Sequence, residues 1–254
     1  MPYVLYEVQD QVAVITLNRP ERMNALGSEL NAELRDAEAR FAADDEARIG
    51  IYIGAGDRAF CAGRDLKEVA SGGAASTPPT AATFERGAVD LGKPMIAAIN
   101  GAAYGGGLEK ALACDIRICS ENATMALAEV KVGLCPPSGS FALPRLVGLS
   151  NAMWLLLSGE PVDAQDAYRM GLVTRVVPQA DLLNTARQMA TTIAGNAPLA
   201  ISATRKLATL GLELPQDYAR RMGASLVASV WGSEDAVEGA KAFAEKRPPQ
   251  WQSR

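Results

Sequence analysis

The chain has 254 residues, of which 48% are hydrophobic and 21% charged, a composition typical of a globular protein with a substantial core. The formal net charge is −4 and there is no basic run, which argues against a nucleic-acid partner. No apolar run approaches the ~18 residues of a membrane span, and residues 1–11 lack the apolar segment of a signal peptide, so neither is expected.

Histidine is absent, which excludes a Ser–His–Asp or Cys–His triad, a histidine general base and a histidine-ligated metal. Acid–base chemistry therefore falls to carboxylates, Lys, Tyr or Cys. The four cysteines form no CxxC pair, so we expect no metal site and a reducing, cytoplasmic compartment.

The N-terminal part alternates between strands and helices. Residues 3–8 and Val12–Leu17 are predicted to form a hairpin across a polar turn. Ser28–Ala43 carries apolar residues at helical spacing, with Ser28 placed to cap the helix. Residues 49–53 then read as a short buried strand.

Residues 54–59 match G-x-G-x-x-A, a pattern typical of dinucleotide-binding folds. We discount the match because residues 60–63 do not open a regular helix. In addition, residues 71–80 form a Gly/Ala/Ser/Pro segment, expected to be a mobile loop, where such a fold would need a strand ending in an acid. Residues 60–66 are instead predicted to turn tightly into a short helix, and residues 83–91 to form another.

Three consecutive glycines lie between a predicted buried strand, Met95–Ile99, and an apolar helix at residues 108–113. Glycine permits a tight turn and close approach of a ligand. The first N–H groups of a helix lack internal partners and carry the positive end of its dipole, so this turn suits an oxyanion. Glu109 lies on the apolar face of the helix. Burying a carboxylate there costs free energy, so its presence indicates a specific role. Close helix–sheet packing, with Glu109 solvated, would give the same glycine pattern.

The order strand, turn, helix recurs at residues 49–70 and 95–113, which is typical of successive turns of a parallel sheet. Further on, residues 123–132 alternate in polarity, so Glu129 and Lys131 share one face if the stretch is extended. From spacing alone, a surface ion pair between these two side chains is the simpler interpretation.

The remaining elements become increasingly helical along the chain. The predicted elements are a strand at 115–119, a Pro- and Gly-rich loop at 133–140, helices at 141–147, 151–157 and 161–171 (with Asp163 as cap and Gly171 as stop), a strand at 172–177, and helices at roughly 181–195, 198–209, 215–230 and 233–246. The composition therefore divides the chain, near residues 180–200, into an α/β part and an all-helical part.

Several motifs together, in order and at this spacing, resemble the crotonase superfamily, the enoyl-CoA hydratase/isomerase family. The strongest are Ala-Phe-Cys-Ala-Gly-Arg-Asp-Leu at 59–66 and Asn-Gly-Ala-Ala-Tyr-Gly-Gly-Gly-Leu-Glu at 100–109. Supporting matches lie at residues 113–116, 129–133, 144–148 and 243–247.

The resemblance implies an α/β fold, a spiral of repeated ββα units followed by a helical C-terminal region. We therefore expect a core with the acyl-CoA site at residues 1–195 and a helical oligomerisation region at residues 196–254. It also implies a homohexamer built from two trimers and an acyl-CoA thioester substrate, with no cofactor beyond the coenzyme A of the substrate.

The resemblance also implies the site residues. The thioester oxygen is held by two main-chain N–H groups, which map onto Arg64 and Gly106. Fixed donors stabilise the negative charge that grows on this oxygen as an enolate forms, each typically worth ~3 kcal/mol in the barrier. Two glutamates hold a water over the double bond in hydratases, and they map onto Glu109 and Glu129. The implied substrate-binding residues are Arg22, Ala25, Ala62, Asp65, Leu66, Lys67 and Tyr104, with Phe243 and Lys246 coming from a neighbouring subunit.

Two positions depart from the family pattern. Pro137 stands where a glycine N–H helps to hold the catalytic water in hydratases, and proline has no N–H. Tyr104 stands where small aliphatic residues are common, which reshapes the acyl pocket. The expected activity is therefore hydration or dehydration of an acyl-CoA. A double-bond isomerase, or a non-catalytic acyl-CoA binder, is the alternative, and the departures suit an isomerase or a dehydratase for a functionalised acyl group.

Overall fold

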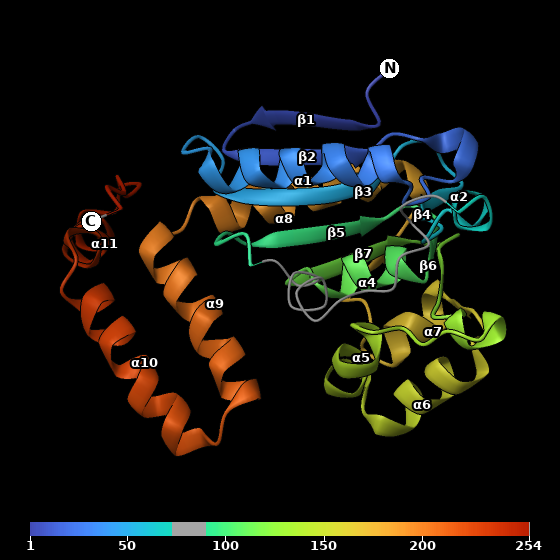
Figure 1. The fold of residues 1–254 in the computed structure, drawn as a ribbon. Coiled ribbons are helices and arrows are strands. Elements are labelled where there is room, and N and C mark those ends of the chain that lie inside the picture. Colours follow the sequence, from blue (N-terminus) through green and yellow to red (C-terminus); the bar gives the residue numbers. More distant parts are fainter. Residues whose placement is uncertain (73–89, 254) are drawn as a thin grey trace.

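The computed structural model describes residues 1–72 and 90–253. The expected mobile loop at 71–80 and helix at 83–91 fall almost wholly outside this range. Two sheets organise the described chain (Figure 1), one of six strands in the order β1-β2-β3-β5-β7-β10 and one of four strands in the order β4-β6-β8-β9.

The six-stranded sheet begins with the predicted hairpin, which is confirmed as the antiparallel pair β1 (Val4–Gln9) and β2 (Val12–Leu17). The other strands lie parallel to β2, and they are β3 (Ile49–Gly54), β5 (Met95–Ile99), β7 (Ile116–Ser120) and β10 (Val176–Val177). Every residue of β5 is buried, as expected for a parallel strand covered on both faces.

Each long central strand is followed by a short strand of the second sheet. These strands are β4 (Ala59–Cys61) after β3, β6 (Ala102–Tyr104) after β5 and β8 (Thr124–Ala126) after β7, with β9 (Val162–Asp163) at the edge. The helices α2 (Leu66–Ala70) and α4 (Gly106–Leu112) follow β4 and β6, so the ββα repeat of the crotonase-like fold is confirmed. A strand, and not a helix, follows residues 54–59, which bears out our rejection of the dinucleotide motif.

Two helices cover opposite faces of the large sheet. On one face, α1 (Ser28–Ala43) contributes Leu30, Leu34 and Phe41 to the larger hydrophobic cluster. On the other, α8 (Leu182–Ala194) packs its buried alanines against Ile51, Ile96 and Ile118. The prediction that Ser28 caps α1 is wrong, because Ser28 is the first helical residue and Gly27 precedes it as the N-cap.

The stretch at 123–132 is only partly extended, which corrects the expected strand. β8 ends at Ala126, and Glu129–Val132 forms a 3₁₀ helix. Lys131 pairs with Glu160, with 2.7 Å between Nζ and Oε1, and not with Glu129, the partner that spacing alone suggested before the family resemblance assigned Glu129 to the site. Because the strand ends at Ala126, Glu129 lies in the 3₁₀ helix and does not follow the alternation of an extended strand.

The later helices are confirmed with shifted bounds. They are α5 (Gly139–Val147), α6 (Leu149–Ser158), α7 (Ala164–Arg169), α9 (Pro198–Glu213), α10 (Gln216–Trp231) and α11 (Glu234–Glu245). Asp163 caps α7 as predicted, accepting a hydrogen bond of 2.7 Å from the N–H of Asp166. The helices α9 and α10 stand away from the sheets in Figure 1. Within residues 1–72 and 90–253, no helix has the length and apolar character needed to cross a bilayer.

Candidate active site

The two glycine-containing turns pack directly against each other. Gly63 and Gly105 have positive φ, at 85° and 51°, a conformation that side chains disfavour. A Cβ on Gly63 would lie 2.6 Å from the carbonyl oxygen of Tyr104 and 3.3 Å from the nitrogen of Gly106. A Cβ on Gly107 would lie 2.1 Å from the carbonyl oxygen of Cys61. The glycines therefore bring the main chain just before Arg64 against the N-terminus of α4.

Gly106 is the first residue of α4, so its N–H has no acceptor within the helix. The preceding N–H, that of Gly105, donates to the carbonyl oxygen of Ala126 over 2.9 Å and ties the turn to β8. The first turn of α4 thus presents the N–H of Gly106 at the positive end of a helix dipole, as the glycine pattern predicts.

Glu109 lies one turn into α4, and its carboxyl group is held by a different helix. Its Oε1 accepts hydrogen bonds of 2.8 Å from the N–H groups of both Ser138 and Gly139 at the start of α5. Burial raises the pKa of Glu109 above its ordinary value, and these two hydrogen bonds oppose that rise by favouring the ionised form.

Glu129 is placed beside the same turn by the 3₁₀ helix. Its Oε1 lies 3.1 Å from the position that a Cβ on Gly105 would occupy. Its Oε2 is buried and has no hydrogen-bond partner within residues 1–72 and 90–253. Burial and the negative charge of Glu109 raise the pKa of Glu129, while its own main-chain N–H lowers it. Glu109 is therefore close enough to Glu129 for its charge to affect the protonation of Glu129.

Pro137 does not prevent its loop from donating to a carboxylate. The two residues after it, Ser138 and Gly139, supply the N–H groups that hold Glu109. This role of Ser138 and Gly139 was not predicted from the sequence, where the N–H lost at position 137 is the more conspicuous feature. The available signal was the start of α5, because the first N–H groups of any helix need an acceptor from elsewhere.

The structure brings together residues 22–26 and 62–67, the two segments that carry most of the implied substrate-binding residues. The N–H of Ala62 donates to the carbonyl oxygen of Met23 over 3.0 Å, and Leu26 forms a parallel bridge with Arg64. Arg22, Leu66 and Lys67 are exposed, Ala62 is half-buried and Ala25 is buried. Tyr104 is half-buried, and its hydroxyl lies 3.0 Å from Oγ1 of Thr124.

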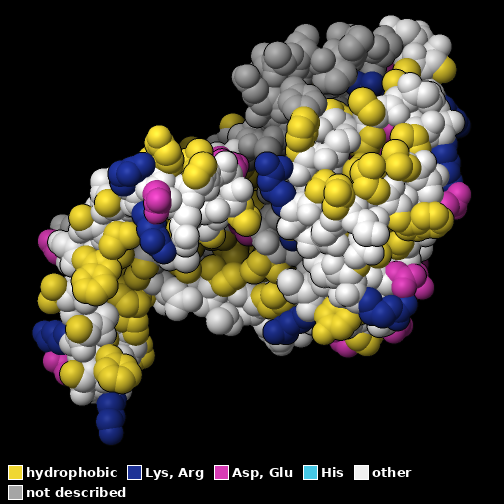
Figure 2. All heavy atoms as spheres, turned by 90° about the horizontal axis from the view of Figure 1, so that it is seen from below, with side chains coloured by type: hydrophobic (Ala, Val, Ile, Leu, Met, Phe, Trp, Pro, Cys, Tyr) yellow, Lys and Arg dark blue, Asp and Glu magenta, His cyan; other side chains and the backbone are white. Residues whose placement is uncertain are grey.

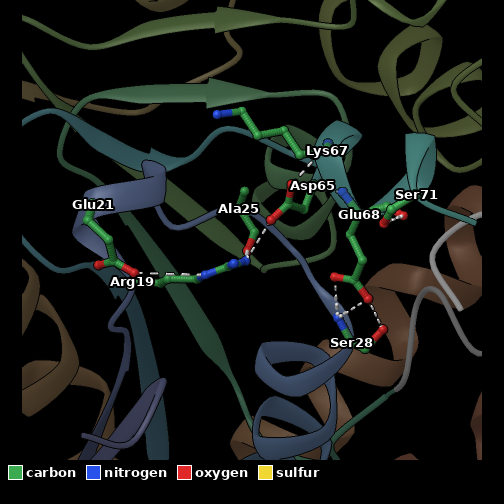
Figure 3. A network of polar contacts seen from close by, with 8 residues as sticks. All are labelled: Arg19, Glu21, Ala25, Ser28, Asp65, Lys67, Glu68 and Ser71. Carbon is green, nitrogen blue, oxygen red and sulfur yellow. Dashed lines mark hydrogen bonds and ion pairs between the residues drawn. The ribbon is translucent and has the colours of Figure 1, made fainter. Parts of the chain in front are cut away.

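Asp65 is occupied by structural contacts. Its Oδ1 accepts hydrogen bonds from the N–H groups of Lys67 and Glu68 and caps α2, while Oδ2 lies 2.9 Å from Nη1 of Arg19 (Figure 3). Burial raises the pKa of Asp65, but these N–H groups and Arg19 outweigh it and leave the pKa below its ordinary value. The sequence analysis missed Arg19, which lies 46 residues away in the chain.

Phe243 and Lys246 are exposed at the end of α11, and Figure 1 shows α11 at the opposite end of the molecule from α2. Within one chain, these two residues do not join the site. Their contribution to the site of a neighbouring subunit stays a prediction.

The repeated ββα units and the two closely packed glycine turns define a crotonase-type fold. The chain belongs to the family described as Enoyl-CoA hydratase/isomerase, which it matches over residues 7–254.

Several proteins with assigned names are similar in sequence to this chain. An (E)-benzylidenesuccinyl-CoA hydratase of Thauera aromatica is 44% identical over 259 residues, covering 98% of each chain. A carnitinyl-CoA dehydratase of Proteus mirabilis is 42% identical over 250 residues, covering 96% of this chain and 95% of the relative. The crystal structure of an enoyl-CoA hydratase from Bacillus anthracis covers 99% of this chain and all of its own, with a TM-score of 0.92 and 33% identity. These matches support a hydratase-type enzyme acting on acyl-CoA.

Proposed function

We propose that the chain adds water to a functionalised 2-enoyl-CoA thioester, or removes water from the corresponding 3-hydroxyacyl-CoA. The observation that carries the proposal is the pair of partly buried carboxyl groups, Glu109 in the helix that Gly106 opens and Glu129 beside Gly105, with the charge of Glu109 reaching Glu129. Because burying two carboxyl groups near each other is costly, their convergence supports a chemical role.

The different surroundings of the two carboxyl groups suggest different roles. Glu109 accepts two N–H groups, which favour its ionised form and suit a general base. Glu129 has an unsatisfied Oε2 and lies within the field of Glu109, which favours its protonated form and suits a general acid.

In the hydration direction, Glu109 takes a proton from water as the water oxygen bonds to C3 of the substrate. The electrons of the C2–C3 double bond move towards the thioester carbonyl and form an enolate, whose oxygen is held by the N–H groups of Arg64 and Gly106. Glu129 then gives its proton to C2. Dehydration runs through the same steps in reverse.

The proposed acyl group carries a functional group beyond the reacting double bond. Two relatives above 40% identity are named for benzylidenesuccinyl-CoA and carnitinyl-CoA, not for a straight-chain substrate. Tyr104 adds an aromatic ring with a hydroxyl group immediately before the glycine turn. Both observations favour a substrate with an aromatic or polar acyl substituent.

The proposal extends to coenzyme A binding and to the assembly of subunits. The coenzyme A nucleotide would lie along the loops at residues 22–26 and 62–67, completed by Phe243 and Lys246 of a neighbouring subunit. The subunits would form a cytoplasmic homohexamer, with residues 1–195 as the core and residues 196–254 as the oligomerisation region.

A substrate panel tests this function. Purified protein is incubated with straight-chain and functionalised 2-enoyl-, 3-enoyl- and 3-hydroxyacyl-CoA thioesters, and the conjugated-enoyl absorbance is followed. We expect kcat/KM to be highest for a functionalised 2-enoyl or 3-hydroxyacyl thioester. Turnover of 3-enoyl-CoA alone would replace hydration with double-bond isomerisation, and binding without turnover of any thioester would favour the non-catalytic binder.

A further inference from the structure

We propose that Arg19 is a positioning residue for the main-chain donor at residue 64, acting through its ion pair with Asp65. The inference rests on the proposed function, because it concerns the donor that would hold the thioester oxygen. Arg19 lies in the loop after β2, whereas Asp65 opens α2, and Figure 3 shows their side chains pointing towards each other.

The ion pair is shielded from water. Nη1 of Arg19 lies 2.9 Å from Oδ2 of Asp65, and the two side chains are only 18% and 8% exposed. The other oxygen of Asp65 accepts the N–H groups of Lys67 and Glu68, so the carboxylate joins the cap of α2 to the loop that carries Arg19. A shielded, hydrogen-bonded pair fixes geometry far better than an exposed one.

Main-chain hydrogen bonds flank residue 64 on both sides. The N–H of Leu26 donates to the carbonyl oxygen of Gly63 over 2.7 Å, and the N–H of Asp65 donates to the carbonyl oxygen of Leu26 over 3.1 Å. The direction of the Arg64 N–H is therefore set by where residue 26 lies.

Arg19 also fixes the loop that contains residue 26. Its own N–H donates to Oδ1 of Asn24 over 2.9 Å, and its Nη1 reaches the carbonyl oxygen of Ala25 at 3.5 Å. Asn24 is fully buried, and its Nδ2 donates to the carbonyl oxygen of Ala59 over 2.8 Å, which continues the connection to β4. One arginine thus joins the two segments whose relative position places the donor.

A second set of hydrogen bonds, made by Glu68, and the small residue Gly27 also hold these two segments together. Glu68 accepts a hydrogen bond from the N–H of Ser28 at 3.0 Å and another from its hydroxyl, so α2 is also tied to the start of α1 (Figure 3). A Cβ on Gly27 would lie 2.6 Å from Oε2 of Glu68 and 2.9 Å from Nη1 of Arg19. Glycine at position 27 leaves the space that both side chains use.

We expect the Arg19–Asp65 ion pair to affect catalysis more than the stability of the fold. A donor that holds an enolate oxygen acts only when it is correctly placed, and a displacement of about 1 Å can cost on the order of 10²-fold in rate. Loss of Arg19 should therefore lower kcat more than it raises KM, because the donor's stabilisation of negative charge is realised only as the enolate forms.

The test compares Arg19→Gln and Arg19→Lys with Arg169→Gln, which removes an arginine from an exposed ion pair with Asp166 on α7. The readouts are kcat, KM, the melting temperature and the absorbance of bound 4-(dimethylamino)cinnamoyl-CoA. This push–pull chromophore absorbs at longer wavelength when its carbonyl oxygen is polarised by hydrogen bonds.

We expect Arg19→Gln to lose at least about 10-fold in kcat, more than KM rises, and to give a smaller red shift of the bound chromophore. Arg19→Lys should recover part of both losses, and Arg169→Gln should match the unmodified protein. If Arg19→Gln does not fold, Gly27→Ala supplies the second variant. It keeps every charge but displaces the tips of both Arg19 and Glu68, which hold α2 against residues 25–28, and it should show the same loss of kcat and red shift.

A purely structural role predicts the opposite pattern. A lower melting temperature in the Arg19 variants, with kcat and the red shift unchanged below that temperature, would overturn the inference while leaving the proposed function intact. Absence of both turnover and a red shift in the unmodified protein would instead overturn the proposed function, and the inference with it.

Discussion

Glu109 and Glu129 are both shielded from water, but only Glu109 receives hydrogen bonds from another helix. The N-terminus of α5 holds its carboxylate, whereas Oε2 of Glu129 meets no donor within the described chain, residues 1–72 and 90–253. At the scale of single residues, this difference underlies the proposed roles of Glu109 as base and Glu129 as acid, and it supports two predictions.

Replacing either glutamate with glutamine should nearly abolish turnover. Glutamine keeps the size of the side chain but can neither take nor supply the proton, and such groups typically contribute 10²–10⁴-fold. Glu109→Gln and Glu129→Gln should therefore each lose at least ~100-fold in kcat/KM. Because groups that act as a unit are not additive, the double variant should be little worse than the poorer single one. A mild effect at Glu129 would remove the two-glutamate mechanism and favour an isomerase.

Glu129→Gln should also stabilise the fold at neutral pH. The folded protein raises the pKa of Glu129 above its ordinary value of 4.5, so ionisation favours the unfolded state once the pH exceeds that value. The melting temperature of Glu129→Gln relative to the unmodified protein should rise as the pH increases from about 4.5 through the raised pKa of the folded state, and then level off. Calorimetry from pH 4 to pH 8 measures this difference, and a constant difference would contradict a raised pKa of Glu129 in the folded protein.

At the scale of elements, the first turn of α4 combines a helix start with a close main-chain contact. Gly106 occupies the first helical position, where proline is tolerated by the helix and removes only the N–H. A Cβ at this position would lie 3.2 Å from Cδ1 of Leu26, so any substitution adds the same tight contact. Alanine at position 106 is therefore the matched control for proline.

We expect Gly106→Pro to lose at least ~100-fold in kcat, because removing one donor to an oxyanion typically costs 10²–10³-fold. Gly106→Ala keeps the N–H and should lose far less. Arg64→Ala should keep most activity, since that donor also belongs to the main chain. Steady-state kinetics and circular dichroism of the three variants decide the point, and equal losses for alanine and proline would show that the contact with Leu26 matters more than the N–H.

At the scale of the whole molecule, the helices after α8 expose several large apolar side chains to solvent, more than is usual for a monomeric protein. On α10, Tyr218 is 59% exposed, Met222 58% and Trp231 82%. Figure 2 shows hydrophobic side chains on the projecting helices and on the body beside them. Such surface is typical of a contact between subunits.

The chain should therefore form a homo-oligomer, most simply the hexamer that the family resemblance implies. Multi-angle light scattering at micromolar concentration should give a multiple of the 26.7 kDa chain mass. Trp231→Glu should shift the mass towards smaller species, because it places a charge on the exposed apolar face. Arg169→Gln, an exposed substitution on α7, should leave the mass unchanged. A mass equal to that of one chain for the unmodified protein would contradict this prediction.

The sequence by itself determined the long elements and the position of the glycine turn. Met95–Ile99 and Val12–Leu17 have the same bounds in the structure as in the prediction, because a buried strand of five or six residues leaves a local apolar pattern. The glycines at 105–107 were also readable locally, since Gly105 has a positive φ and a Cβ on Gly107 would collide with the main chain of Cys61. The family motifs then linked these local patterns to acyl-CoA chemistry.

Only the tertiary structure decided which partners these residues meet. The strands Ala59–Cys61 and Ala102–Tyr104 are too short to show a period, and they form because neighbouring chain segments pair with them. The 3₁₀ turn at Glu129, the hold of α5 on Glu109 and the pairing of Arg19 with Asp65 each join segments that local sequence treats as independent. Hydrogen bonds and ion pairs of this kind depend on how elements pack in space, so their partners cannot be read from spacing along the chain.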